Sequence, residues 1–332
     1  MNTPYDFVAI GDIVTDAFIR IKEASVNCDL DKANCKLCMT FGDKVPFESV
    51  DILRAVGNSA NAAVSAARLG LSSALVSNIG SDQDGVECLS ALEKNGVASE
   101  FVTKNIGMIT NYHYVLWYED ERTILVKHQA YNYKLPDIGN PKWLYLSSLA
   151  QNSLPYHEEI EKYLESHPDI KLAFQPGTFQ IKLGVTKLAG LYKRSEVFFC
   201  NVEEAEKILG ITESIEIKEL LKKMSSLGPK ITVITDGPRG AYVFDGVDAW
   251  FMPPYPDEKL PYERTGAGDA FASTFTSALA LGMSIPNALE WGPINSMSVV
   301  QHVGAQEGLL TREKLEEYIK NAPDSYKARK LE

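Results

Sequence analysis

Short apolar runs alternate with longer amphipathic stretches over most of the chain. The run Phe7–Ile10 leads into Gly11 and Asp12, as expected for a buried strand that opens into a loop. Strands that alternate with helices form parallel sheets with crossover helices. The pattern therefore predicts an α/β fold. We expect strands at 7–10, 74–80, 143–146, 171–174, 196–200, 231–235 and 241–244. We expect helices at 57–70, 82–95, 155–166, 178–191, 270–281, 286–303 and 311–320, and a further helix that begins at residue 201.

The pattern changes between residues 101 and 131, where two β-rich runs follow each other without a helix. The runs 112–117 and 123–128 flank the polar turn 119–122 and predict a hairpin. With residues 17–21 this hairpin is expected to form a small sheet that acts as a lid. Residues 23–49 show no periodicity and are interpreted as an excursion from the main sheet. We expect one domain over 1–325, lid segments at about 12–50 and 101–131, and a polar tail over 326–332.

Composition narrows the possible partners. The 332 residues carry a formal net charge of −11, which argues against a general nucleic-acid binder. No apolar run is as long as a membrane span, and the N-terminus lacks the basic start and apolar stretch of a signal peptide. We therefore expect a cytoplasmic protein that acts on small molecules, without a membrane partner.

Three of the five cysteines lie close together in the excursion. Cys28, Cys35 and Cys38 include one C-x-x-C pair, which could begin a zinc site, but no second pair and no histidine accompany it. An odd number of cysteines in a chain without an export signal argues against a disulfide framework. We favour three reduced cysteines in an exposed or lid-packed segment.

The turn Gly266-Ala267-Gly268-Asp269 is the strongest candidate for chemistry. It lies where a loop becomes an apolar helix, and the unpaired amides and dipole of a helix start favour an anion. Asp269 could cap the helix, or it could take a proton from an alcohol held in front of the turn. The nonapeptide 263–271 alone leaves both interpretations open.

Other polar residues stand at predicted strand ends and helix starts. Asp12 and Asp16 follow the first strand, where carboxylates hold substrate hydroxyls or form turns. Asn58 and Asn61 lie in the first turn of a small-residue helix, where their amides could bind a polyol or cap the helix.

Asn201 and Glu204 can share one helical face, so they could orient hydrated magnesium or form a capping box. Gly237, in the turn after the predicted strand 231–235, could admit a nucleotide closely or only make the turn.

Together these motifs resemble the PfkB, or ribokinase-like, family of sugar and nucleoside kinases over roughly 7–311. The segment 265–271 is the most specific and resembles the family's C-terminal signature. The segment 57–61 resembles the N-terminal signature, with Val56-Gly57 where the family usually has two glycines.

Two further motifs follow the family's order. Asn201-x-x-Glu204 is similar to its magnesium and phosphate motif. Thr235-Asp236-Gly237 with Gly240 occupies the place of its nucleotide-binding strand and turn.

The resemblance implies a ribokinase-like three-layer αβα sandwich with a mainly parallel central sheet and a small β-sheet lid. It implies Asp269 as catalytic base, with the amides of Gly266, Ala267 and Gly268 as an anion hole for the transferred phosphoryl group. It implies ATP and Mg²⁺ as cofactors, with the ion held by Glu204 through water. The other implied residues are Asp12, Asp16, Gly57, Asn58 and Asn61 for the acceptor, and Asn201, Glu204, Thr235, Gly237, Gly240 and Asn295 for the nucleotide.

The start of the C-terminal signature departs from the family. Many members have Asp-Thr-Thr or a close variant there, whereas this chain has Glu263-Arg264-Thr265. In members with a monovalent-cation site, an aspartate near the signature helps to build it. Glu263 is a candidate K⁺ ligand, and the charge of Arg264 weakens that expectation.

The resemblance implies an ATP-dependent kinase of a small sugar and leaves a nucleoside as the alternative acceptor. Tyr112, Tyr114, Trp117 and Phe41 could form a slot for a base, or they could only pack the lid. A non-catalytic sugar- or nucleotide-binding regulator is a remoter alternative, against which the complete turn with Asp269 argues. We also expect a homodimer formed through the lid.

Overall fold

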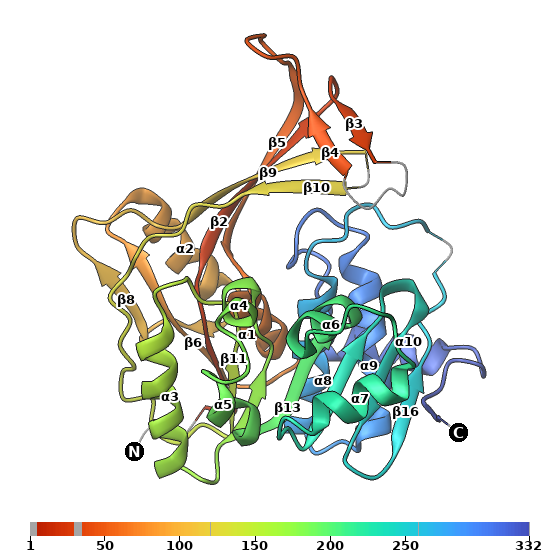
Figure 1. Cartoon of the computed structure of the whole chain (residues 1–332). Helices are drawn as coiled ribbons and strands as arrows, with labels where there is room; N and C mark the ends of the chain where they lie inside the picture. The colour runs from red at the N-terminus through yellow and green to blue at the C-terminus, as the bar shows by residue number, and fades with distance from the viewer. Residues whose placement is uncertain (1–4, 30–34, 120, 258, 332) are drawn as a thin grey trace.

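The computed structural model describes residues 5–29, 35–119, 121–257 and 259–331. Its main sheet has a central block of parallel strands, in the order β14, β13, β12, β11, β1, β6. Their bounds are Ile231–Thr235 (β14), Ser195–Asn201 (β13), Lys171–Phe174 (β12), Trp143–Leu146 (β11), Phe7–Ile10 (β1) and Ser73–Gly80 (β6). The predicted α/β fold with a mainly parallel sheet is confirmed (Figure 1).

Antiparallel strands extend the sheet beyond β14. These are β15 (Ala241–Phe244), β16 (Ala249–Met252) and β17 (Arg329–Lys330). Two short parallel strands, β7 (Val97–Ala98) and β8 (Val102–Asn105), pair with β6 at the opposite end.

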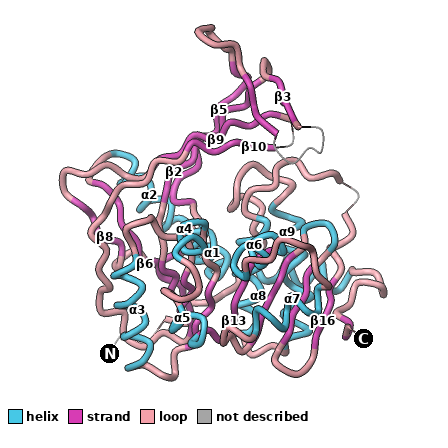
Figure 2. The backbone as a smooth tube through the Cα atoms, in the orientation of Figure 1, coloured by secondary structure: helices cyan, strands magenta, loops and turns pink. Residues whose placement is uncertain are grey.

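Helices cover both faces of the sheet, which makes three layers (Figure 2). Side chains alternate along β1, so that Phe7 and Ala9 belong to one core and Val8 and Ile10 to the other. A strand buried on both faces needs a continuous apolar run, which is why 7–10 could be recognised. The first core involves α1 (Asn58–Arg68), α2 (Gln83–Lys94), α8 (Ala267–Ala280), α9 (Ile285–Val299) and α10 (Arg312–Asn321). The second involves α3 (Leu154–Ser166), α4 (Thr178–Leu183), α5 (Ala189–Arg194), α6 (Val202–Leu209) and α7 (Ile217–Ser225).

A separate four-stranded sheet projects from this body as the lid (Figure 1). Its strands are β10 (Glu121–Leu125), β9 (Tyr112–Tyr118), β2 (Val14–Ile21) and β5 (Phe47–Val56), in that order. The hairpin and its pairing with 17–21 agree with the prediction, although β10 begins two residues earlier. Strand β5 was missed because its first eight residues are exposed or half-buried, so pairing with β2 rather than burial holds them. The division into a domain over 1–325 with lid segments remains a prediction.

Two predicted helices have other bounds. The segment 178–191 contains two short helices, α4 and α5, separated by Gly184 at φ +84°. Helix α9 ends at Val299 rather than at residue 303. The carbonyl of Val300 instead accepts hydrogen bonds from the amides of Tyr262 and Glu263, so the end of α9 holds the loop that leads to α8.

The C-terminal segment, predicted to be a polar tail over 326–332, is attached to the body of the molecule. Tyr326 is buried, and its hydroxyl donates to the Glu290 carbonyl of α9 at 2.6 Å. Residues 329 and 330 pair with β16. One buried aromatic ring and one short strand therefore attach the segment, and Glu332 lies outside the described residues.

The prediction of three reduced cysteines was wrong for two of them. Strands β3 (Ser25–Cys28) and β4 (Cys35–Cys38) form a ribbon whose register places Cys28 opposite Cys35, and a disulfide joins the two. The odd total of cysteines says nothing about a local pair that a hairpin brings together. A disulfide uses two of the three candidate zinc ligands, and the described part of the chain contains no cluster of metal-binding side chains.

Some predictions concern residues that the structure does not describe. The first four residues, residues 30–34 of the excursion and Asp120 of the hairpin turn are among them. Within the described ranges, no helix has the length and apolar character to cross a membrane.

Candidate active site

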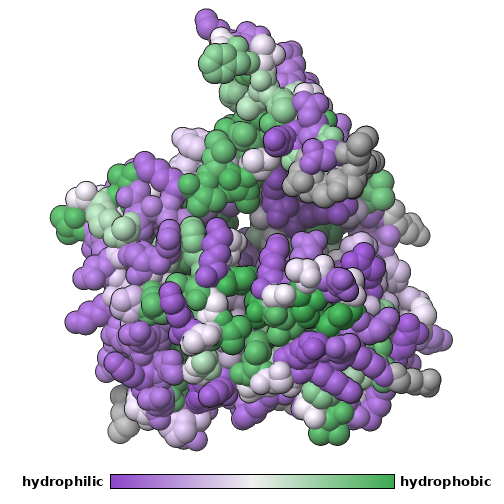
Figure 3. All heavy atoms as spheres, in the orientation of Figure 1, coloured by the Kyte–Doolittle hydropathy of each residue, from purple (hydrophilic) through white to green (hydrophobic). Residues whose placement is uncertain are grey.

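A cavity of about 550 Å³ lies between the lid and the body of the molecule (Figure 3). We call it the acceptor cavity, after the role that the resemblance implies for several of its residues. It brings together Asp16 from the lid with residues of α1, β13, β14, α6 and the start of α8, which the sequence places far apart. The predicted site residues in its wall are Asp16, Gly57, Asn58, Asn61, Asn201, Glu204, Thr235, Gly266, Gly268 and Asp269.

A second cavity of about 520 Å³ adjoins the first. We call it the nucleotide cavity, after the role that the resemblance implies for several of its residues. Thr235, Gly237, Gly240, Ala267 and Gly268 line it, together with apolar side chains from the loop before α8 and from α9. The two cavities share four residues of their walls: Thr235, Arg264, Gly268 and Phe271. The start of α8 therefore stands at the boundary between two spaces that can hold two substrates.

The turn before α8 has the geometry of an anion site. Gly266 is the N-cap at φ +80°, and a side chain there would collide with Ala305, whose Cβ is 2.2 Å from the added carbon. The first helical hydrogen bond runs from the Ala270 amide to the Gly266 carbonyl at 2.8 Å. The amides of Ala267, Gly268 and Asp269 precede it, so they and the helix dipole can face a phosphoryl group.

Asp269 is buried beside this turn, and its carboxylate accepts hydrogen bonds from three side-chain amides. Its Oδ1 accepts from Asn58 at 2.7 Å and Gln175 at 3.2 Å, and its Oδ2 accepts from Asn61 at 2.8 Å. Burial raises the pKa of Asp269, whereas these donors and the charge of Arg122 lower it. The result is an oriented carboxylate with a raised pKa, as general-base catalysis requires.

Asn58→Ala is expected to move the acid limb of the pH–rate profile upward. It removes a donor that stabilises the carboxylate, so the pKa of Asp269 rises further and the ionised base is lost at a higher pH. We also expect kcat at neutral pH to fall about tenfold because the carboxylate is less well oriented. Steady-state rates across pH, with exposed Asn321→Ala as control, test this, and an acid limb at or below the wild-type position would contradict it.

Asn61, predicted to bind the acceptor, contacts the carboxylate of Asp269. Both ends of its buried amide are engaged by the protein, because Nδ2 donates to Asp269 and Oδ1 accepts from Gln306 at 3.0 Å. Asn61 therefore orients the carboxylate from the wall of the acceptor cavity. Gly57 likewise serves the fold, since a Cβ there would lie 2.6 Å from the Asp12 carbonyl oxygen.

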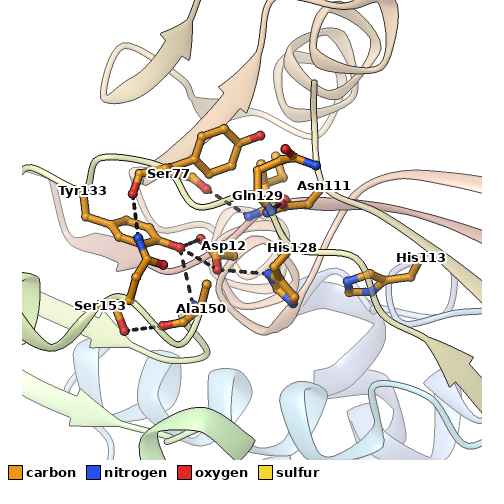
Figure 4. Close-up of polar contacts among 12 residues, drawn as sticks. Asp12, Ser77, Asn111, His113, His128, Gln129, Tyr133, Ala150 and Ser153 are labelled. Carbon is orange, nitrogen blue, oxygen red and sulfur yellow. Dashed lines mark hydrogen bonds and ion pairs between the residues drawn. The ribbon is translucent and has the colours of Figure 1, made fainter. Parts of the chain in front are cut away.

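Two histidines that no sequence motif indicated lie near the predicted aspartates. Figure 4 shows His128 beside Asp12, with His113 nearby. His113 Nδ1 lies 3.3 Å from Asp16 Oδ1, and both residues line the acceptor cavity. His128, also in the wall, lies 3.3 Å from Asp12 Oδ2, and the two imidazole rings are 5.1 Å apart.

Asp12 itself stands behind the cavity wall, contrary to prediction. Both of its carboxylate oxygens accept from the Tyr133 hydroxyl, at 2.8 and 2.9 Å (Figure 4). The hydrogen-bond partner of its carboxylate is therefore Tyr133, and His128 of the cavity wall is a near neighbour of Asp12 at 3.3 Å. Histidines inside a β-rich run look like ordinary strand residues, which is why the two were missed.

Asn201 and Glu204 form the capping box that the sequence left as an alternative. The Glu204 amide donates to Asn201 Oδ1 at 2.8 Å, and Glu204 Oε2 accepts from the Asn201 amide at 2.9 Å. Burial raises the pKa of Glu204, and the charge of Asp269 raises it further. A second carboxylate in the same cavity favours a cation there, so the residues fit hydrated Mg²⁺.

The residues predicted to bind the nucleotide differ in whether they line the nucleotide cavity. Thr235 ends β14, and Gly237 follows in the turn at φ +53° without any atom near its missing side chain. Gly240 is required by packing, since a Cβ would lie 2.4 Å from the Met252 carbonyl oxygen. Asn295 lies outside both cavity walls: its buried amide donates to Thr274 and accepts from the Leu310 amide, so it joins α9 to its neighbours.

Glu263 does not fit the role of a monovalent-cation ligand. Its Oε1 accepts from the amide and the hydroxyl of Thr265, and its Oε2 accepts from the Gly304 amide at 3.3 Å. Arg122 Nε, from the lid, lies 3.8 Å from Oε1. A carboxylate surrounded by hydrogen-bond donors and a guanidinium offers a poor site for a further cation.

Comparisons with known proteins show which family the chain resembles. The pfkB family carbohydrate kinase profile matches residues 48–312. Ribokinase of Bacillus subtilis is 29% identical over 269 residues, which cover 79% of this chain and 87% of that protein.

Solved structures show the same fold. Arabidopsis thaliana ribokinase complexed with ribose and ATP superposes with a TM-score of 0.79 at 19% identity, over 96% of this chain and 99% of that one. The nucleoside kinase of Methanocaldococcus jannaschii gives a TM-score of 0.75 at 16% identity, over 96% and 100% of the two chains. Since the family profile spans most of the sequence, the chain belongs to the pfkB family of carbohydrate kinases.

Proposed function

We propose that this kinase transfers the γ-phosphoryl group of ATP to a hydroxyl of a small sugar, with Asp269 as the base. The observation that carries the proposal is the position of α8, whose first residues stand between the two cavities with Asp269 facing the acceptor side. A base beside an anion hole, between an acceptor and a nucleotide, is what phosphoryl transfer to an alcohol needs.

The proposed transfer forms one bond to phosphorus, breaks one, and moves one proton. The acceptor oxygen forms a bond to the γ-phosphorus, the bond from that phosphorus to the bridging oxygen of ADP breaks, and the hydroxyl proton passes to the Asp269 carboxylate. The amides of Gly266, Ala267 and Gly268 would stabilise charge on the phosphoryl oxygens. Asn201 and Glu204 would hold a hydrated magnesium ion, which supplies charge neutralisation for the phosphates.

Side chains of the acceptor cavity favour a sugar over a nucleoside. Asp16, His113 and His128 offer hydrogen-bonding groups suited to hydroxyls. Of the four aromatic residues that could have formed a slot for a base, none lies in the described wall of either cavity, although Phe18 and Phe179 line the acceptor cavity. Trp117 is buried against Tyr262, and Phe41 is fully exposed.

Product analysis with a panel of acceptors tests the proposal. Neutral aldoses and ketoses, and purine and pyrimidine nucleosides, are incubated with ATP and Mg²⁺, and phosphorylated products are identified by mass. We expect turnover of at least one sugar and a lower kcat/KM for every nucleoside. A preference for a nucleoside would overturn the sugar assignment, and no turnover of any acceptor would favour a non-catalytic regulator.

We further propose that two copies associate through the lid. Its strands and adjoining loops expose many large apolar side chains, and large exposed apolar surface marks interaction sites. The exposed apolar residues of the lid outside the acceptor cavity are Phe41, Phe47, Val50, Ile52, Tyr114 and Leu125. Light scattering is expected to give twice the chain mass of 36.7 kDa. A monomer mass at micromolar concentration would contradict the dimer.

A further inference from the structure

The lid rests on the loop that leads into the catalytic turn. Arg20 of β2 donates from Nη1 to the Tyr262 hydroxyl at 3.1 Å, and its guanidinium lies 4.6 Å from the centre of the Trp117 ring. The Trp117 and Tyr262 rings meet edge to face at 5.0 Å. Tyr262 immediately precedes Glu263, so the lid contacts the chain shortly before the N-cap Gly266.

Glu263 links this contact to the anion hole. Its side chain is 2% exposed, and a buried carboxylate is costly unless charge and hydrogen bonds compensate it. Its bonds to Thr265 and Gly304 fix the residues on both sides of Gly266, because Gly304 is followed by Ala305, against which Gly266 packs. The orientation of Glu263 therefore determines the position of the turn.

Arg122 is the lid residue that reaches this carboxylate. Its Nε lies 3.8 Å from Glu263 Oε1 and is buried, without a hydrogen bond to any described residue. The side chain also lines the acceptor cavity that contains Asp269. A small approach of the lid would complete an Arg–carboxylate hydrogen bond, and such charge-assisted bonds are among the strong ones.

We propose that Arg122 is a positioning residue, which couples closure of the lid to the ordering of the anion hole and replaces a monovalent cation at Glu263. The inference rests on the proposed kinase function and adds a residue that no sequence motif indicates. Its charge comes from the lid, so the site is complete only when the lid is closed over an acceptor. Phosphoryl transfer is then independent of K⁺.

Arg122→Gln tests the coupling, with Lys127→Gln as matched control because Lys127 is an exposed lid residue just beyond β10. We expect kcat to fall about 100-fold in Arg122→Gln, with the KM for ATP changed less than about threefold, since the loss concerns the transition state. Arg122→Lys is expected to restore part of kcat. In a Glu263→Gln background, Arg122→Gln should have little further effect on the pH-independent kcat, because the two residues act as a pair. The comparison is made on the plateau of the pH–rate profile, because the charge of Arg122 also lowers the pKa of Asp269.

A second readout needs no turnover. Hydrogen exchange of peptides covering 262–269, measured with ADP bound, is expected to be faster in Arg122→Gln than in the wild type and the control. Wild-type rate and thermal midpoint are expected to be equal in potassium and tetramethylammonium chloride. Control-like kcat and exchange in Arg122→Gln, or activation of the wild type by K⁺ of about fivefold or more, would overturn the inference. Exchange evaluates the coupling even if the acceptor panel finds no kinase activity, so the two failures are distinguishable.

Discussion

Asp269→Asn is expected to lower kcat by about 10³-fold or more, because a positioned general base contributes about 10² to 10⁴ and the amide accepts no proton. ATP is expected to bind nearly as in the wild type, since the nucleotide cavity is formed by other side chains. Single-turnover transfer and nucleotide titration measure the two effects separately. Near-normal transfer in the variant would remove Asp269 from the role of base.

Asp269→Asn is also expected to lower the stability of the protein, so stability must be measured together with activity. Three amide groups donate to the carboxylate, and an asparagine presents a fourth donor to them. At least one buried donor loses its partner, at about 1–3 kcal/mol. Exposed Asp324→Asn is the matched control, and rates are to be compared below the thermal midpoint of the weaker variant.

Alanine at Gly266 and at Gly268 is expected to separate folding from catalysis. Gly266→Ala places a side chain at φ +80° and against Ala305, and we expect it to lower the free energy of unfolding by about 2–4 kcal/mol. Gly268→Ala meets no atom closer than Gln175 Nε2 at 4.0 Å, so its stability should stay within about 1 kcal/mol of the wild type. Chemical denaturation measures both changes.

Gly268→Ala is expected to lose activity although it keeps its stability. Its methyl group would lie in the wall that the two cavities share, where the phosphoryl group must pass. We expect kcat to fall about 10- to 100-fold although the protein stays folded. A stable variant with wild-type kcat would show that the start of α8 is not in the path of transfer.

The central sheet could be predicted because each of its strands carries its signal in a few consecutive residues. Strands such as β11 and β12 are largely buried on both faces, and their apolar runs carry that requirement in a few consecutive residues. Strand β5 carries no such signal, since it is held by pairing with β2 and stays largely exposed. The end of α9 was misjudged for a similar reason, because the Val300 carbonyl is used by Glu263, in a loop far earlier in the chain.

The residues of the site also differ in how well the sequence alone indicates them. Asp269 and its glycine turn lie in one short segment, so the sequence alone could indicate them. Gln175, Arg122 and His128 reach the cavity from separate elements that only the folded chain brings together. Asn61 was assigned to the acceptor because its type suits a hydroxyl, but its partner proved to be the carboxylate of Asp269.

Phosphoryl transfer from ATP to a sugar is followed most directly by ³¹P NMR of the complete reaction, with wild type, ATP, Mg²⁺ and the sugar that the panel identifies. We expect a sugar phosphate ester and ADP in equal amounts, and neither product above background with Asp269→Asn. ADP accompanied only by inorganic phosphate, or an ester formed equally fast by Asp269→Asn, would contradict the proposed reaction.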